Sequence, residues 1–320
     1  MIWLTWRQHR LEGLITALLV IAIAGLVGGL VVAAQPLLDQ IKLACPIVVD
    51  DSCGRALIAF NARFGMFQQP LYLAFLVLPV LSGMFIGAPL LAREFEQGTD
   101  EMVWTQGITR RKWLFIKLAI LGSATIVMAG ILAVAGQEWS TAVPDSSYSQ
   151  WFAFDVQGPE FVAYALFSFA LGVAAGAAIG RTVPAMAVVI VGFLAVRAAI
   201  GLFARRNFLP PVESELTGPL FSGQGQAWLI GNQQPVDMHG ITISSDQFNQ
   251  ITDACLHPAS GVVPGNFDLQ ACWHEHGIRV LQTYQPAERF PIFQGIETTI
   301  FVLGAIALLG FAVWLVRRRA

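Results

Sequence analysis

Two histidines and a cysteine near the end of the chain have side chains that commonly bind metal ions. Cys272 is followed closely by His274 and His276. A zinc-protease helix needs two histidines separated by three residues, with glutamate after the first, and one residue separates this pair. On a strand both imidazoles would share a face, and His239 and His257 are candidates for a third ligand. The pattern does not define a ligand set, and we assign no metal.

Sequence signatures of catalysis or nucleotide binding are missing from the chain. It has no GxxxxGK[ST] loop for the phosphates of ATP and no GxSxG nucleophile elbow. No pair of carboxylates or histidines inside an apolar segment indicates a membrane hydrolase. We therefore expect neither an enzyme nor a resident cofactor, and any use of ATP with Mg²⁺ would take place on another chain.

Two charges lie inside otherwise apolar segments, Arg197 and Glu297. Charged side chains within a membrane span are usually paired or face a cavity. A pair between the two segments is one interpretation. The alternative is that each side chain extends to the nearby membrane interface.

The chain has four cysteines, Cys45, Cys53, Cys255 and Cys272. Four cysteines allow three disulfide connectivities. The simplest is local pairing of Cys45 with Cys53 and of Cys255 with Cys272. Four free thiols are the alternative.

The composition indicates the environment of these residues. Of the 320 residues, 55% are hydrophobic and 12% are charged, whereas soluble domains have about 25% charged residues. Disorder requires the opposite composition. The net charge of −2 excludes binding of nucleic acid through phosphate neutralisation. A polytopic membrane protein remains.

Six apolar segments approach the length of about 20 residues that a helix needs to cross a bilayer. They cover residues 13–34, 71–92, 118–136, 161–180, 184–203 and 295–315. The first is longer than the apolar region of a signal peptide, so we interpret it as a retained helix rather than a cleaved leader.

The distribution of lysine and arginine predicts the orientation. With both termini in the cytoplasm, 11 of these residues lie in short inner segments and 7 in longer outer loops, as the positive-inside rule requires. All four cysteines then lie on the oxidising side, which favours disulfides. Residues 204–292 form the longest outer segment, in which we expect a strand at 240–245 and a helix at 246–254 with Ser245 or Asp246 as its cap.

The expected fold is an all-α polytopic protein of the cytoplasmic membrane with six spanning helices and both ends inside. A small disulfide-tied extracytoplasmic domain separates the fifth and sixth helices. By residues, this gives a membrane domain at 1–203 with a cytoplasmic loop at 93–117, an outer domain at 204–292, and a last helix with a basic tail at 293–320.

The cytoplasmic loop has the pattern of an interrupted helix. Gly98 suits the left-handed position that ends a helix, and Thr99 suits an N-cap, with Asp100 in the following first turn. The short helix would expose Met102 and Trp104. These apolar side chains would either dock into a partner protein or rest on the membrane interface.

Glycines repeat at four-residue spacing in the fourth apolar segment. Gly172, Gly176 and Gly180 share one helix face, which lets another helix approach closely. We favour packing within the chain over a contact between two chains.

Several motifs resemble a known family, the permease subunits of actinobacterial ATP-binding-cassette (ABC) exporters of the type-two class. This class is similar in fold to the G-subfamily transporters. The motifs are MIWLTWRQHR at 1–10, AREFEQGT at 92–99, WTQ at 104–106, TRRKW at 109–113, TYQPA at 283–287 and FQGIET at 293–298.

The resemblance implies partners and a site. It implies two copies of a separate ATPase subunit, which bind ATP and Mg²⁺, and a second permease chain in a homodimer or heterodimer. It also implies that the loop between the second and third spans couples to the ATPase. The residues expected to serve that coupling are Glu94, Glu96, Gly98, Thr99, Asp100, Met102 and Trp104.

The expected function is therefore export of an amphipathic or hydrophobic substrate, such as a drug, antibiotic, peptide or lipid-like molecule. Apolar spans with few charges suit such a cargo. The alternative is a membrane-anchored sensor or immunity protein that acts through its outer domain.

Overall fold

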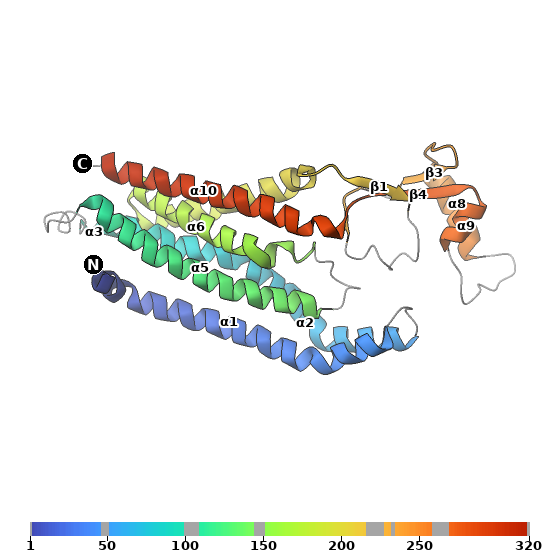
Figure 1. The fold of residues 1–320 in the computed structure, drawn as a ribbon, viewed down its shortest axis with the longest axis horizontal. Helices are drawn as coiled ribbons and strands as arrows, with labels where there is room; N and C mark the ends of the chain where they lie inside the picture. Colours follow the sequence, from blue (N-terminus) through green and yellow to red (C-terminus); the bar gives the residue numbers. More distant parts are fainter. Residues whose placement is uncertain are drawn as a thin grey trace. The chain divides into compact units, whose positions relative to one another are not determined.

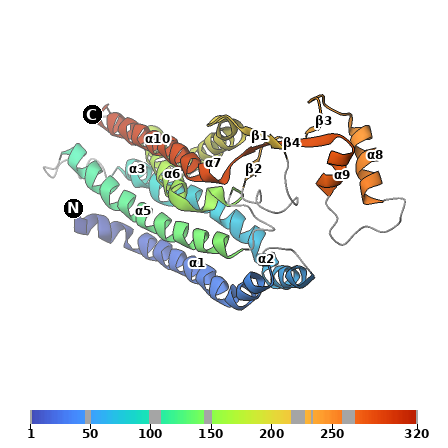
Figure 2. The ribbon, with the colours of Figure 1, turned by 45° about the vertical axis from the view of Figure 1, so that its right-hand side comes forward.

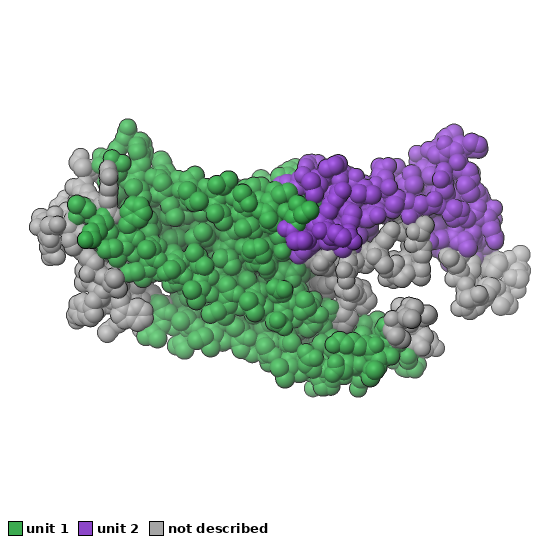
Figure 3. Space-filling model, viewed as in Figure 1, with its two compact units in different colours: residues 1–144, 152–205, 292–320 green, residues 145–151, 206–291 purple. Residues whose placement is uncertain are grey.

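The computed structural model of the chain describes residues 2–45, 51–98, 109–143, 151–215, 227–231, 234–257 and 269–318. These residues divide into two compact units (Figure 3). The larger comprises residues 1–144, 152–205 and 292–320, and the smaller comprises residues 145–151 and 206–291.

The larger unit is built from long helices (Figure 1). They are α1 (Ile2–Ala44), α2 (Asp51–Ser82), α3 (Ala88–Gln97), α5 (Arg110–Ala142), α6 (Gly158–Ile179), α7 (Thr182–Ala199) and α10 (Phe290–Arg318). Irregular helical turns extend two of these helices. A π-helical turn, η1 (Gly83–Gly87), joins α2 to α3, and a second, η3 (Ile200–Ala204), joins α7 to the 3₁₀ turn η4 (Arg205–Asn207).

Six helical stretches among the described residues are long and apolar enough to cross a membrane. They run over Gly13–Ala44, Ser52–Gln97, Lys112–Ala142, Gly158–Ile179, Thr182–Asn207 and Ala287–Arg318. The chain is thus a mostly helical, multi-pass membrane protein, as its composition predicts.

Most of these helices extend well past the predicted spans. Residues 35–70, which lie between the first two predicted spans, are helical up to Ala44 and again from Asp51. An apolar stretch of about 20 residues locates the part of a helix that suits the bilayer. Where the same helix continues with polar residues, hydrophobicity no longer indicates that it is helical.

Helix α6 is the centre of the larger unit. It packs against α2, η1, α3, α5 and α7, and 72% of its apolar window is buried inside the unit, against 11% for α1 and for the α7 stretch. Helices α1 and α5 run side by side in both ribbon views (Figures 1 and 2). Much of α1 and α7 is consequently exposed apolar surface, which suits a lipid environment.

Two of the three glycines in the α6 row allow close packing within the chain. A Cβ added at Gly176 would lie 2.6 Å from the carbonyl oxygen of Ala88, and one at Gly172 would lie 2.6 Å from the Ala88 nitrogen. Gly180, which we predicted to be a packing residue, has another role. It ends α6 in the left-handed conformation, with φ 70°, which favours glycine for a conformational reason.

The smaller unit contains a four-stranded antiparallel sheet around β4 (Ile278–Gln285). Its partners are β1 (Val212–Glu215), β2 (Trp228–Leu229) and β3 (Gln234–Asp237). Helices α8 (Ser245–Leu256) and α9 (Leu269–Glu275) complete the unit, and a disulfide between Cys255 and Cys272 joins them.

The sheet differs from the sequence expectation at residues 240–245. That stretch is not a strand, and Thr242 forms an isolated bridge with Val236. The helix that follows begins one residue earlier than expected, because the Ser244 hydroxyl accepts a hydrogen bond from the Gln247 N–H and forms the cap. The core beside the disulfide is made of Trp273, Ile278 and Val280.

Candidate functional site

A cluster of charges, of which Glu297 is fully buried and the others are 11–17% exposed, lies where α6 begins, α7 ends and α10 begins. Asp155 is on the 3₁₀ turn η2 (Phe154–Val156) that precedes α6, Arg205 follows α7, and Glu297 is on α10. The Arg205 guanidinium donates from Nε to Glu297 Oε2 and from Nη2 to Glu297 Oε1, both at 2.8 Å. It also donates to Asp155 Oδ1. One guanidinium therefore bridges two carboxylates from different elements.

Tyr164 and Arg197 complete this cluster, which we call the charge cluster (Asp155, Tyr164, Arg197, Arg205 and Glu297). The Tyr164 hydroxyl lies 2.6 Å from Glu297 Oε1 and 3.1 Å from Asp155 Oδ1. Arg197 Nη2 lies 3.3 Å from Asp155 Oδ1, and the guanidinium stacks 4.3 Å from the centre of the Tyr164 ring. The side chains of Tyr164 and Glu297 are fully buried, so these interactions act in a low-dielectric environment.

A third carboxyl group lies next to the charge cluster. Glu160 is fully buried, and its Oε1 accepts a hydrogen bond of 2.6 Å from the Gln294 amide on α10. Gly158 leaves room for that amide, because a Cβ there would lie 2.7 Å from Gln294 Nε2. This contact is a second polar connection between α6 and α10.

The two arginines set the charge state of Asp155. Burial by itself raises the pKa of this carboxyl group. The positive charges of Arg197 and Arg205 oppose burial, and hydrogen bonds from Arg205 and Tyr164 add to their effect. The net result is a pKa below the usual aspartate value, so Asp155 is ionised near neutral pH.

The charge cluster is suited to joining helices rather than to catalysis. It consists of carboxylates, guanidinium groups and one phenol, and the Tyr164 hydroxyl and both carboxylates are held by one another and by the arginines. Buried ion pairs of this kind are costly to break, because removal of one partner leaves an uncompensated charge. The cluster fixes α6, α7 and α10 relative to one another at this end.

The sequence identified two members of the charge cluster and missed three. Arg197 and Glu297 do lie together in it, connected through Asp155 and Arg205, whereas the two interpretations from sequence were a direct pair and separate extension to the interface. Arg205 was assigned to the outer loop. Its spacing of eight residues from Arg197 was an available signal, since that spacing places both on nearly one face of a continuous helix.

At the opposite end of α6, an ion pair joins α3 to α5. Glu94 Oε1 accepts a hydrogen bond from Lys117 Nζ, and the Lys117 ammonium also lies 4.7 Å from the centre of the Trp113 ring. The Lys117 side chain is 3% exposed and that of Glu94 is 14% exposed. Glu94 is thus engaged inside the chain, whereas we expected it to face a partner.

The neighbouring Glu96 is exposed and joins α3 to α7. Its Oε2 accepts a hydrogen bond of 2.6 Å from the Thr182 hydroxyl at the start of α7. Gly98 ends α3 with φ 62°, the left-handed conformation that the sequence predicts. Thr99, Asp100, Met102 and Trp104 lie outside the described residues. The helix resumes at α5, where the Thr109 side chain accepts from the Lys112 N–H and forms the cap.

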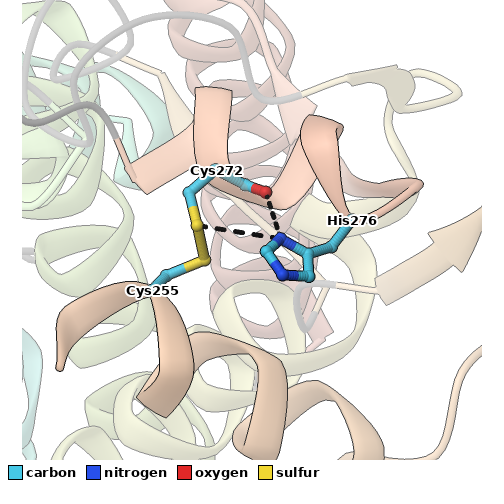
Figure 4. Close-up of side chains that lie close together, drawn as sticks. All are labelled: Cys255, Cys272 and His276. Carbon is cyan, nitrogen blue, oxygen red and sulfur yellow. Dashed lines mark hydrogen bonds between the residues drawn. A yellow bond between two sulfur atoms is a disulfide. The ribbon is translucent and has the colours of Figure 1, made fainter. Parts of the chain in front are cut away.

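The third group of candidate residues lies in the smaller unit (Figure 4). Cys255, Cys272 and His276 have their ligand atoms within 4.8 Å of one another. The two sulfurs are bonded to each other, and His276 Nδ1 lies 2.9 Å from the Cys272 carbonyl oxygen. A disulfide offers no thiolate to a metal ion, so the group as it stands is a structural link. The second disulfide joins Cys45 and Cys53, which completes the local pairing.

The comparison with protein families shows one similarity. The model of a family described as "ABC-2 membrane transporter related" matches residues 15–205, from α1 to the end of the α7 stretch. No curated protein and no solved structure matches the chain.

Proposed function

Because the chain belongs to the ABC-2-related membrane transporter family, we propose that it is the permease subunit of an ATP-driven exporter. The family match carries this proposal, since it covers five of the six candidate spans. ATP hydrolysis would take place on a separate ABC ATPase, present in two copies beside two permease chains. As part of the same proposal, the chain would be similar to actinobacterial exporters and would share the fold of the G-subfamily transporters.

The orientation that we propose has both termini in the cytoplasm. Its support is the excess of lysine and arginine in the short segments on that side. The end of α3 and the starts of α5 and α7 would then face the ATPase, and the charge cluster and both disulfides would lie toward the outside. Cysteines introduced at Gln97 and Gln106 should resist membrane-impermeant maleimide in intact cells, and labelling from outside would overturn this orientation.

Energy coupling would begin at the cytoplasmic end of α3. A force on residues 99–108 reaches α3 directly, and α3 is joined to α5 through Glu94 and Lys117 and to α7 through Glu96 and Thr182. Glu94 would therefore transmit movement within the chain, whereas we expected it to contact the ATPase. Glu96 and the loop residues remain the candidates for contact with the ATPase.

The charge cluster would respond to that movement at the outer end. Helices α6, α7 and α10 meet there through directional ion pairs, which have few alternative arrangements. Inward-open and outward-open states would differ in how these helices are joined. The cargo would be amphipathic or hydrophobic, because the walls of the spans are apolar.

The decisive experiment combines association with turnover. The tagged chain is co-expressed with an ABC ATPase encoded beside it, purified, and reconstituted in vesicles for measurement of ATP hydrolysis. We expect the ATPase to be retained and its activity to depend on the permease. Absence of any associated ATPase would overturn the proposal. The alternative of a sensor acting through its outer domain is not favoured, because the family match lies in the spanning helices.

A further inference from the structure

A cavity of about 540 Å³ lies within the larger unit, bounded chiefly by α1, α2, η1 and α5. Its walls are mostly aliphatic and aromatic, among them Ile15, Leu19, Phe85, Leu121 and Met128. Cavities that hold small ligands have volumes of roughly 300–1,000 Å³ and predominantly apolar walls. This cavity therefore has the size and the lining of a binding site.

Polar groups along the cavity wall are already engaged within the chain. The Ser82 hydroxyl lies 2.7 Å from the Pro79 carbonyl oxygen and 3.0 Å from that of Ala165. The Thr125 hydroxyl donates to the Leu121 carbonyl oxygen at 2.9 Å. A ligand in the interior would gain little from polar groups of its own and would lose their hydration. The interior therefore favours the hydrocarbon part of a ligand over a polar group.

Charge is found at one end of the cavity. Among the described lining residues Arg93 is the single charged one, and it lies on α3 one turn before the residues that end this helix. Thr182, at the start of α7, lines the cavity at the same end. Phe161, near the start of α6, lies toward the opposite end. The lining thus runs from one cationic side chain into an apolar interior, which matches an anionic headgroup with an attached tail. The Glu96 carboxylate near this end is not part of the lining and accepts a hydrogen bond from Thr182.

The cavity is open to the lipid-facing surface of the helices. Side chains at its margin are well exposed, with 59% for Ile15 and 56% for Phe85. Phe85 is on the π-helical turn η1, where Gly83 and Gly87 are pressed against α6. Turns of this kind often occur at functional sites. The turn changes the direction in which α2 presents its side chains and so shapes this wall.

We propose that the cavity binds an acyl chain of an anionic membrane lipid, with the phosphate headgroup at Arg93. The binding depends on the packing of these helices, and not on what the transporter carries. The proposed orientation would place this headgroup in the cytoplasmic leaflet. The experiment below uses detergent micelles, so an error in orientation would leave its outcome unchanged.

The probe is phosphatidylglycerol with a photoreactive diazirine near the end of one acyl chain, added to the purified full-length chain. We expect saturable cross-links to peptides covering residues 13–23 and 120–132, competed by unlabelled phosphatidylglycerol. In the Ala124→Trp variant, which fills the cavity from α5, these cross-links should fall to the non-saturable level. Val127→Trp is the matched control, because Val127 lies on the same helix with 61% exposure outside the lining, and its saturable labelling should be unchanged.

A second variant tests the headgroup. Arg93→Gln should reduce the preference for phosphatidylglycerol over phosphatidylcholine about fivefold, as expected for a cation near a charged lipid surface. An unchanged preference would overturn the assignment of the headgroup. Equal saturable labelling in Ala124→Trp and Val127→Trp, or no saturable labelling in the unmodified chain, would overturn the site.

Discussion

Glu297 and Arg205 form a two-point ion pair between helices that are distant in sequence. Both carboxylate oxygens of Glu297 accept hydrogen bonds of 2.8 Å from one guanidinium, and the Glu297 side chain is fully buried. Such paired geometry is stronger and more directional than a single contact.

Replacement of Glu297 by glutamine should strongly destabilise the larger unit. It leaves the Arg205 charge buried with half of its compensation removed, and loss of one partner of a buried pair costs about 3–5 kcal/mol. The measurement is thermal unfolding of the purified chain in detergent. Glu288→Gln is the control, because Glu288 is exposed on the turn before α10. Equal melting temperatures for the two variants would contradict the structural role of the pair.

Stability should depend on pH through Asp155. Its folded pKa is lowered, so the carboxylate stabilises the fold at pH values above the unfolded pKa of about 3.9. That contribution is lost progressively as the pH falls from there through the folded pKa. The difference in melting temperature between the unmodified chain and Asp155→Asn should therefore be large at neutral pH and shrink below about pH 4. Asp39→Asn, at a 65% exposed side chain, should show no comparable change.

A methyl group added at Gly172 should destabilise the fold, whereas one added at Gly130 should not. The first would clash with backbone atoms of Gly87 and Ala88, which cannot move without separating α6 from α3. The second has no neighbour within 4 Å, and glycine within a helix costs roughly 0.5–1 kcal/mol relative to alanine. Thermal unfolding should show Gly172→Ala destabilised and Gly130→Ala unchanged or slightly stabilised. A stabilised Gly172→Ala would contradict the close approach.

The disulfide of the smaller unit should contribute measurably to its stability. Cys255 and Cys272 are 17 residues apart, a loop for which chain entropy predicts about 3 kcal/mol. Cys272→Ser should make this unit unfold at lower temperature while membrane insertion is retained. Limited proteolysis followed by mass spectrometry locates the change. Detection of both thiols in free form in oxidised protein would contradict the pairing.

Two substitutions test energy coupling at the cytoplasmic end. Glu96→Arg reverses a charge at the end of α3 and removes the acceptor for Thr182, and Trp104→Ala removes a large apolar side chain worth about 2 kcal/mol if it anchors a partner. Both should insert normally yet lower substrate-stimulated ATP hydrolysis and export together. Thr182→Val separates the two effects of Glu96, since it breaks the same bond and leaves the charge. Normal ATPase retention and turnover in the double variant Glu96→Arg/Trp104→Ala would show that coupling lies elsewhere.

Local features of the chain were accessible from sequence because their causes are local. The six apolar segments follow from the length and composition that a bilayer requires. The end of α3 at Gly98 follows from the conformational freedom of one residue. Local pairing of Cys45 with Cys53 follows from the short chain between them.

Residues of the same type at a regular spacing have different roles, and the sequence pattern does not separate those roles. Gly180 repeats the spacing of Gly172 and Gly176, yet it caps α6. The pattern alone does not show where a helix ends. Glu94 has the same charge as Glu96 two residues later, but Lys117 on α5 buries the first and leaves the second exposed.

The amino-acid sequence alone was enough to locate six segments suited to crossing a membrane and the charges within them. How those charges are compensated depends on the fold. Asp155 and Arg205 come from a turn and a helix extension with no apolar pattern of their own, and they meet Glu297 because α6, α7 and α10 converge at one end. An ion pair acts over a few ångströms and carries no periodic signature along the chain, so only the packing of the helices shows which charges form one.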